Sequence, residues 1–260
     1  MTKELIAEIS QQLLEAERTS HPIDPISPKY DDLSYEDVYA IQLKSFDIRV
    51  GRGEVIVGKK IGLSSRAMQE QFNINEPDYG IVSHRMVLRE GQPIPMKRLI
   101  LPRLEPEMAF VLKEDLKGPG VTAAAVLKAT EGIMPAFEVI DSRYKDWKIT
   151  VKDSISDNAS CGAIVLGGRL TPISDIDLRL VGMVLEKNGE VIATGAGAAV
   201  LGNPAESVAW LANKLADYGI TLQKGEFIMS GSLVRAVPVE AGSSLKATFD
   251  RFGSVSAFFE

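Results

Sequence analysis

The chain has 260 residues, and a hydrophobic fraction of 45% is enough for a sizeable core in one large domain, or in a core domain with a small appendage. The formal net charge is −6 and the basic residues are scattered, which argues against nucleic acid or an anionic membrane as the main partner. The single cysteine, Cys161, excludes an internal disulfide and is typical of a cytoplasmic protein. No apolar stretch has the length of a transmembrane helix.

Residues 1–53 are predicted to form a small helical part. Apolar side chains recur at helical spacing over residues 2–18, and the acidic residues in this segment distinguish it from a signal peptide. A proline-rich connector follows. Ser34, with Asp37 three residues later, is expected to cap a second helix that ends at Gly51.

Residues 54–260 are predicted to form a β-rich catalytic core, which makes the whole chain an α+β protein. The Asn-Gly pair at 188–189, between two apolar segments, is typical of a hairpin with a type I′ turn. Helices are expected over residues 65–72, 123–129 and 203–219, the last with Asn203 as its cap. Strands are expected over residues 55–62, 103–112, 133–140, 163–166, 227–229, 244–249 and 254–259.

Two glutamates one residue apart, Glu105 and Glu107, interrupt an apolar segment that is predicted to be a strand. Side chains two apart on a strand share a face, and two adjacent buried carboxylates are costly without a cation. Glu138 interrupts a second apolar segment. Three oxygen ligands without a nearby histidine or cysteine suit Mg²⁺ or Mn²⁺, while solvent-facing glutamates are the alternative. Pro106, which lacks an N–H, predicts an edge strand or a bulge here.

Five other polar residues lie in segments where they could take part in chemistry. Lys59 and Lys60 lie near the end of a predicted strand, and alternation places them on opposite faces. One of them can therefore point inward, where a lysine beside a metal can exchange protons. The alternative is that they are ordinary surface lysines. Asp78 is locally typical of a turn. Asn158 and Ser160, in a small polar segment, can hydrogen-bond a carboxylate or cap a turn.

Several common site types are disfavoured by the sequence. His21 and His84 are the only histidines, which nearly rules out a histidine-based zinc site or a Ser-His-Asp triad. The glycine-rich segment 195–200 has Val200 at the third glycine position of a dinucleotide-binding loop. Cys161 is predicted to be a small buried residue rather than a nucleophile.

Seven segments, taken in order, resemble one known family over essentially the whole chain. They resemble the 2-keto-4-pentenoate (2-hydroxypenta-2,4-dienoate) hydratases and the related 4-oxalocrotonate decarboxylases of meta-cleavage breakdown of aromatic compounds. The resemblance implies the fold of the fumarylacetoacetate hydrolase C-terminal domain, with a small helical N-terminal part. The segments are GKKIGLSS at 58–65, EPDYG at 76–80, Glu105-x-Glu107, FEVIDSR at 137–143, DWKI at 146–149, DNASCG at 157–162 and GAGAAVLG at 195–202.

The resemblance implies a role for each site residue. Lys60 would transfer protons, Asp78 would be the active-site acid or base, and Asn158 and Ser160 would hold the substrate. The metal, Mg²⁺ or Mn²⁺, would be bound by Glu105, Glu107 and Glu138. Relatives form homo-oligomers, and some hydratases associate with their pathway decarboxylase, so both partners are expected here.

Hydratase and decarboxylase are close alternatives. Asp78, the Cys161-Gly162 pair and the segment 146–149 are hydratase-like, so we expect addition of water to a 2-hydroxy-2,4-dienoate, giving a 4-hydroxy-2-oxo acid. Decarboxylation of 4-oxalocrotonate is the main alternative. A Schiff-base lyase using Lys60, a C–C hydrolase and a non-enzymatic binding protein are more remote. The pocket for the substrate tail is expected to draw on Arg143, Trp147, Leu233 and Arg235.

Overall fold

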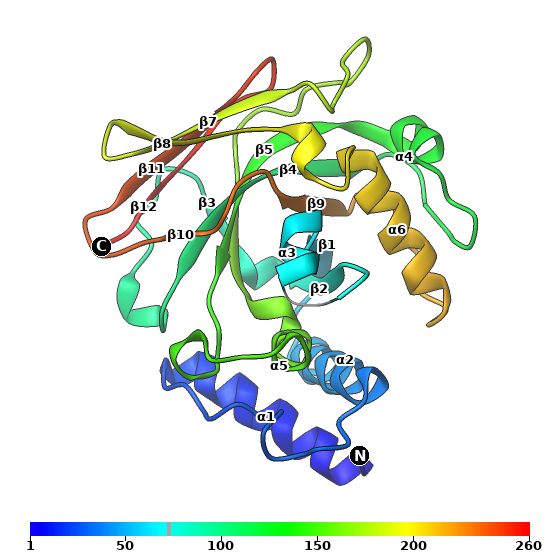
Figure 1. The fold of residues 1–260 in the computed structure, drawn as a ribbon, viewed down its shortest axis with the longest axis vertical. Helices are drawn as coiled ribbons and strands as arrows, with labels where there is room; N and C mark the ends of the chain where they lie inside the picture. Colours follow the sequence, from blue (N-terminus) through cyan, green and yellow to red (C-terminus); the bar gives the residue numbers. More distant parts are fainter. Residues whose placement is uncertain (72–73) are drawn as a thin grey trace.

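The computed structural model describes residues 1–71 and 74–260, and two β-sheets form its core (Figure 1). The larger sheet has eight strands in the order β2-β1-β9-β4-β5-β6-β3, with β10 pairing along β4. Its strands are β1 (Ile56–Gly62), β2 (Asp78–Ser83), β3 (Val87–Arg89), β4 (Arg103–Leu112), β5 (Thr130–Ile140), β6 (Cys161–Leu166), β9 (Phe227–Ser232) and β10 (Val237–Pro238).

The smaller sheet has the strand order β12-β11-β7-β8 and lies against β5 and β6 of the larger one. Alternation of buried and exposed residues along β11 is what an antiparallel sheet with one solvated face requires. The β7–β8 turn places Asn188 and Gly189 at φ of 54° and 86°, as the predicted hairpin demands. Its strands are β7 (Gly182–Lys187), β8 (Glu190–Ala196), β11 (Ser244–Phe249) and β12 (Gly253–Phe258).

Helices cover the edges and one end of the larger sheet (Figure 1). Within the described residues, no helix is both long and apolar enough to cross a membrane. The helices are α1 (Lys3–Thr19), α2 (Tyr35–Gly51), α3 (Arg66–Gln71), α4 (Ala123–Ala129), α5 (Val151–Ser156) and α6 (Pro204–Ala216).

The first two helices pack on one another and are tied to the sheet by a buried amide. Ser10 Oγ on α1 donates to the carbonyl of Ile41 on α2 at 3.0 Å. Gln42 Nε2 donates to the carbonyls of Tyr79 on β2 and Ile155 on α5, at 2.8 and 3.2 Å. This amide joins α2 to the two elements that stand beside the polar side chains described below. The division at residue 53 stays a prediction.

Strand β4 is central, and this corrects one of the two expectations for Pro106. It pairs with β5 on one side and with β9 and β10 on the other, so it is not an edge strand. The strand pairing is irregular opposite Pro106. Glu107 pairs with Ser232 and Leu104 pairs with Val237, so the two residues of β4 between these pairs face the four residues that join β9 to β10. Leu233 N still donates to the Pro106 carbonyl at 3.2 Å, and the excess residues that follow it bulge out of the sheet before β10. The missing N–H of Pro106 therefore interrupts no regular ladder.

Most predicted elements are present, with shifts at their ends. Ser34 and Asp37 form a reciprocal capping box on α2, and Asn203 caps α6, which ends at Ala216 rather than near residue 219. Asp78 begins β2 rather than a turn. The predicted helix over 65–72 corresponds to α3, and its expected last residue lies outside the described residues. Close packing explains why residue 197 is a glycine, because a Cβ there would lie 1.8 Å from the Leu178 carbonyl oxygen.

Candidate active site

Three glutamates meet because of the register between two neighbouring strands. Glu105 on β4 stands directly opposite Glu138 on β5, and Glu107 shares the face of Glu105 two residues along the strand. One carboxylate oxygen from each lies within 4.8 Å of the other two. The structure thus brings together the three residues that were predicted to bind a metal.

The environment of these carboxylates suits a cation better than it suits three charges alone. Glu107 and Glu138 are fully buried, and Glu107 Oε1 and both oxygens of Glu138 have no hydrogen-bond partner among the described residues. Burial, followed by the charge of Glu138, raises the pKa of Glu105 to about 8 and that of Glu107 well above its ordinary value. Unpaired buried oxygens in an all-oxygen donor set fit a hard divalent ion.

The remaining oxygen of Glu107 is held by a bulge in β9. Gly231 N donates to Glu107 Oε2 at 2.7 Å, and Gly231 has a φ of 109° that only glycine adopts without strain. A Cβ at this position would also lie 1.9 Å from Ser64 Oγ. The register of β4 and β9 shifts beside this residue, so the bulge aims a backbone donor at the carboxylate.

Lys60 is the buried cation beside the glutamates. Its Nζ lies 3.2 Å from Glu138 Oε1, and the side chain is 3% exposed. Burial alone would lower the pKa of Lys60, but the nearby charges of Glu138 and Asp78 outweigh it and raise that pKa above its ordinary value. Lys59, on the opposite face, is also buried and pairs with both oxygens of Glu226 at 2.7 Å. Thus both lysines point inward, and Lys60 alone meets the glutamates.

Asp78 stands at the start of β2, across from the end of β1, and faces the same space. It is buried, and its Oδ1 has no hydrogen-bond partner among the described residues. Burial raises the pKa of Asp78, an effect that the charge of Lys60 partly offsets. A carboxyl group in this environment retains its proton more readily than a solvated aspartate, which suits it to proton exchange in the cavity.

Ser160 reaches the same space from a strained turn. Asn158, Ala159 and Ser160 form the 3-10 turn η4, with φ of 55°, 49° and 55°. Three successive non-glycine residues in this region are costly and persist only where the surroundings fix them. The Asn158 amide does part of this, because Nδ2 donates to the Ile81 carbonyl at 2.9 Å and Oδ1 accepts from the Ile81 N–H at 2.8 Å.

Arg143 holds both ends of this turn from behind. Its guanidinium donates to the Asp157 carboxylate and carbonyl just before the turn, and to the Cys161 carbonyl at 2.8 Å just after it. It also donates to the Asp141 carbonyl at 2.6 Å. Arg143 is buried and does not line the cavity, so its predicted place in the substrate pocket is wrong. Its structural role is evident from the burial of its guanidinium beside the equally buried carboxylate of Asp157.

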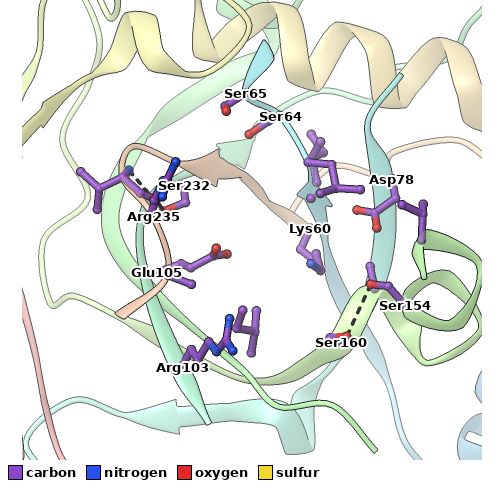
Figure 2. A pocket seen from close by; sticks show the side chains of 18 of the residues that line it. Lys60, Ser64, Ser65, Asp78, Arg103, Glu105, Ser154, Ser160, Ser232 and Arg235 are labelled. Atoms are coloured by element: carbon purple, nitrogen blue, oxygen red, sulfur yellow. Dashed lines mark hydrogen bonds between the residues drawn. The ribbon is translucent and has the colours of Figure 1, made fainter. Parts of the chain in front are cut away.

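These side chains converge on one cavity of about 590 Å³, shown from close by in Figure 2. Lys60, Asp78, Glu105 and Ser160 line it, and Figure 2 shows Glu105 and Lys60 on facing sides. Asn158 does not line it, because its amide is bonded to β2. Neither histidine lines it, and Cys161 is buried behind it, where burial raises the pKa of its thiol well above the ordinary value.

Some lining residues were not singled out from the sequence. Arg103 lines the cavity, and its guanidinium stacks 4.6 Å from the centre of the Trp147 ring. The indole N–H of Trp147 donates to the Leu101 carbonyl at 2.8 Å, which fixes the ring. Arg103 shares the strand face of Glu105, and period-two alternation could have found it. Trp147, Leu233 and Arg235, expected near the substrate tail, do line the cavity.

Comparison with known proteins identifies the relatives of this chain. The family described as fumarylacetoacetate (FAA) hydrolase C-terminal matches residues 48–259. A 2-hydroxypent-2,4-dienoate hydratase of Pseudomonas putida is 47% identical over 221 residues, which are 85% of this chain and 100% of that protein. A 2-hydroxyhexa-2,4-dienoate hydratase of Comamonas testosteroni is 42% identical over 259 residues, covering 99% of this chain and 98% of that protein. The 4-oxalocrotonate decarboxylase of Pseudomonas putida G7, solved with magnesium and adipate, is 38% identical with a TM-score of 0.97, covering 100% of this chain and 99% of its own.

Metal affinity should rise with pH. Ions bind ionised carboxylates, and the pKa of Glu105 is about 8 without an ion, so protons compete with the metal below that pH. Titration of Mn²⁺ by calorimetry from pH 6 to pH 9 should show affinity increasing through about pH 8, with proton release detected by changing the buffer. Affinity that is independent of pH across this range would contradict the interpretation.

Arg143→Lys should destabilise the protein. Lysine keeps the charge but cannot reach both ends of the η4 turn, which leaves buried oxygens unpaired, and we expect a loss of about 3 kcal/mol in the free energy of unfolding. Denaturant unfolding measures this. As a matched control, Arg251→Lys changes an exposed arginine, 3.7 Å from Asp250, and should alter stability by less than about 0.5 kcal/mol. Equal losses of stability in the two variants would contradict the claim that Arg143 stabilises the protein by bonding both ends of the η4 turn.

Proposed function

Because the chain belongs to the fumarylacetoacetate hydrolase C-terminal family, we propose that it is a metal-dependent hydratase of 2-hydroxy-2,4-dienoates in meta-cleavage catabolism of aromatic compounds. The observation that carries the proposal is the placement of two buried proton-exchanging groups, Lys60 and Asp78, in the cavity that Glu105 lines, with Lys60 Nζ 3.2 Å from Glu138 Oε1. Hydration of a dienol requires both proton removal and proton delivery, and these residues supply the two functions.

Glu105, Glu107 and Glu138 would hold the metal, for which we propose Mg²⁺ or Mn²⁺. The fit rests on the unpaired oxygens of Glu107 and Glu138 and on the absence of nitrogen or sulfur from the ligand set. When bound, the ion supplies Lewis-acid stabilisation of the negative charge that develops on the 2-oxygen of the substrate. The solved decarboxylase relative contains magnesium, which supports the choice.

Lys60 would be the first group to exchange a proton with the substrate. Without an ion, the carboxylates keep Lys60 protonated. A divalent cation on the glutamates would weaken that attraction, which brings the pKa of Lys60 down toward a range where it can accept and return a proton. Lys60 would take the proton of the 2-hydroxyl group, and delivery of a proton to the carbon chain would then convert the resulting dienolate into an unsaturated ketone.

Asp78 and Ser160 would complete the reaction. Asp78, whose pKa burial raises, is placed in the cavity to deliver a proton to the carbon chain or to orient the incoming water. Ser160 Oγ, held in its strained turn, would bind the substrate from the side opposite Glu105. Water then adds at the far end of the conjugated system, and the product is a 4-hydroxy-2-oxo acid. Asn158 would act through the turn that it fixes to β2.

Decarboxylation is the second candidate, favoured by one observation. The structure of the 4-oxalocrotonate decarboxylase matches this chain over its full length, and its fold would place the same triad. A decarboxylase must stabilise the electrons left by departing CO₂, which needs the metal but not an added water. Both reactions need a proton exchanged with the carbon chain, but only hydration must also orient an added water, and Asp78, buried in the cavity with a pKa raised by burial, is placed for that step.

Cytoplasmic location and homo-oligomeric assembly, with a pathway decarboxylase as a further partner, belong to the same proposal. The free, buried Cys161 supports the location, and the decarboxylases among the relatives support the pathway partner. A Schiff-base lyase is less well supported, because that chemistry needs no metal and gives no reason for the three glutamates that meet beside Lys60.

Glu107→Gln tests the proposal. The substitution keeps the shape of the side chain but removes one ligand charge, and turnover of 2-hydroxypenta-2,4-dienoate with Mg²⁺ should fall by a factor of about 100 or more. Loss of dienoate absorbance measures the rate, and mass spectrometry identifies the product. Glu114→Gln, an exposed glutamate just beyond β4, should keep wild-type activity. Full activity of Glu107→Gln, or release of CO₂ from 2-oxo-3-hexenedioate by a wild-type protein that leaves 2-hydroxypenta-2,4-dienoate unchanged, would overturn the hydratase proposal.

A further inference from the structure

Two arginines line the cavity without a carboxylate partner. Neither Arg103 nor Arg235 makes an ion pair or side-chain hydrogen bond with any residue in the part of the chain that the structure describes, whereas Lys60 pairs with Glu138. In Figure 2 the two arginines lie on different sides of Glu105. A cavity that presents unpaired guanidinium groups is suited to an anionic ligand, since guanidinium donors match a carboxylate in geometry and charge.

The position of Arg235 follows from the excess of residues opposite Pro106. The segment 233–236 has two more residues than β4 offers for pairing. Beyond Leu233, whose N–H donates to the Pro106 carbonyl at 3.2 Å, it therefore bulges out of the sheet between β9 and β10. Ser232 Oγ closes the turn by donating to the Val234 carbonyl at 2.7 Å. All four residues of the segment line the cavity, and Arg235 is exposed at its rim.

The two arginines differ in what surrounds them. Arg103 shares the strand face of Glu105, two residues away, and is stacked on Trp147, so its charge acts at the end of the cavity where the glutamates lie. Arg235 is flanked by Leu233, Val234 and Ala236, which line the cavity with apolar surface. Arg235 therefore offers a second positive charge within a part of the lining that is otherwise apolar.

Resting on the proposed function, we propose that Arg235 binds a second carboxylate at the far end of the substrate. The first carboxylate and the 2-oxygen would be held at the glutamates, and the apolar side chains beside Arg235 would contact the carbon chain. The substrate class is then a dicarboxylic 2-hydroxy-2,4-dienoate, and Arg235 determines specificity rather than the chemical step.

Two substrates that differ only in the terminal carboxylate test this assignment. Wild-type protein should have a higher kcat/KM for 2-hydroxyhepta-2,4-dienedioate than for 2-hydroxyhepta-2,4-dienoate. Arg235→Gln should raise KM for the diacid about tenfold, leave kcat near its wild-type value and leave both constants for the monoacid unchanged. Arg85→Gln removes an exposed arginine that does not line the cavity and should change neither substrate. Equal effects of Arg235→Gln on both substrates, or none on either, would overturn the inference.

Binding of unreactive ligands separates this inference from the proposed function. Calorimetry with Mg²⁺ present should show 2-oxoadipate binding more tightly than 2-oxohexanoate, and the difference should disappear in Arg235→Gln. If that pattern holds while neither dienoate is hydrated, the hydratase proposal fails and the role of Arg235 stands. If both dienoates are hydrated equally well and Arg235→Gln binds the two oxo acids as wild type does, the inference fails and the hydratase proposal stands.

Discussion

Mutual repulsion among three buried carboxylates is the constraint on which the rest of this structure depends. Glu105, Glu107 and Glu138 lie within 4.8 Å of one another, and the lone ammonium group of Lys60 beside them cannot balance three negative charges. Burial of such a set is unfavourable unless protons or a cation neutralise it. The raised pKa values of Glu105 and Glu107 show that protons neutralise these carboxylates when no cation is bound. The oxygens of Glu107 and Glu138 that accept no hydrogen bond show where a cation would bind.

Much of the surrounding backbone is irregular, and each irregularity serves a side chain. The bulge at Gly231 aims an N–H at Glu107, and the excess residues between β9 and β10 place Arg235 at the cavity rim. The left-handed turn at 158–160 carries Ser160, and its strain is offset by the buried hydrogen bonds of Arg143 and Asn158. The regular β4–β5 ladder supplies the fixed frame, since cross-strand register alone places Glu105 against Glu138.

The sequence predicts local features of this protein better than long-range ones. The capping box of α2 and the Asn188-Gly189 hairpin depend on residues a few positions apart, so their signals are complete within a short window. Glu105, Glu107 and Glu138 were identifiable because each breaks an apolar strand. Asp78 looked like a turn residue because its pairing with β1 is not visible locally. The role of Arg143 was missed for the same reason, since a cavity-lining arginine and a buried clamp have the same local pattern.

The most direct test of the account is the position of a metal in crystals of the protein. Crystals soaked in Mn²⁺ at a pH above 8 should give one strong anomalous peak between β4 and β5, within about 2.5 Å of a carboxylate oxygen from each of Glu105, Glu107 and Glu138. A map with no peak among these three side chains, or with peaks only at other residues, would contradict the claim that the buried triad is a cation site.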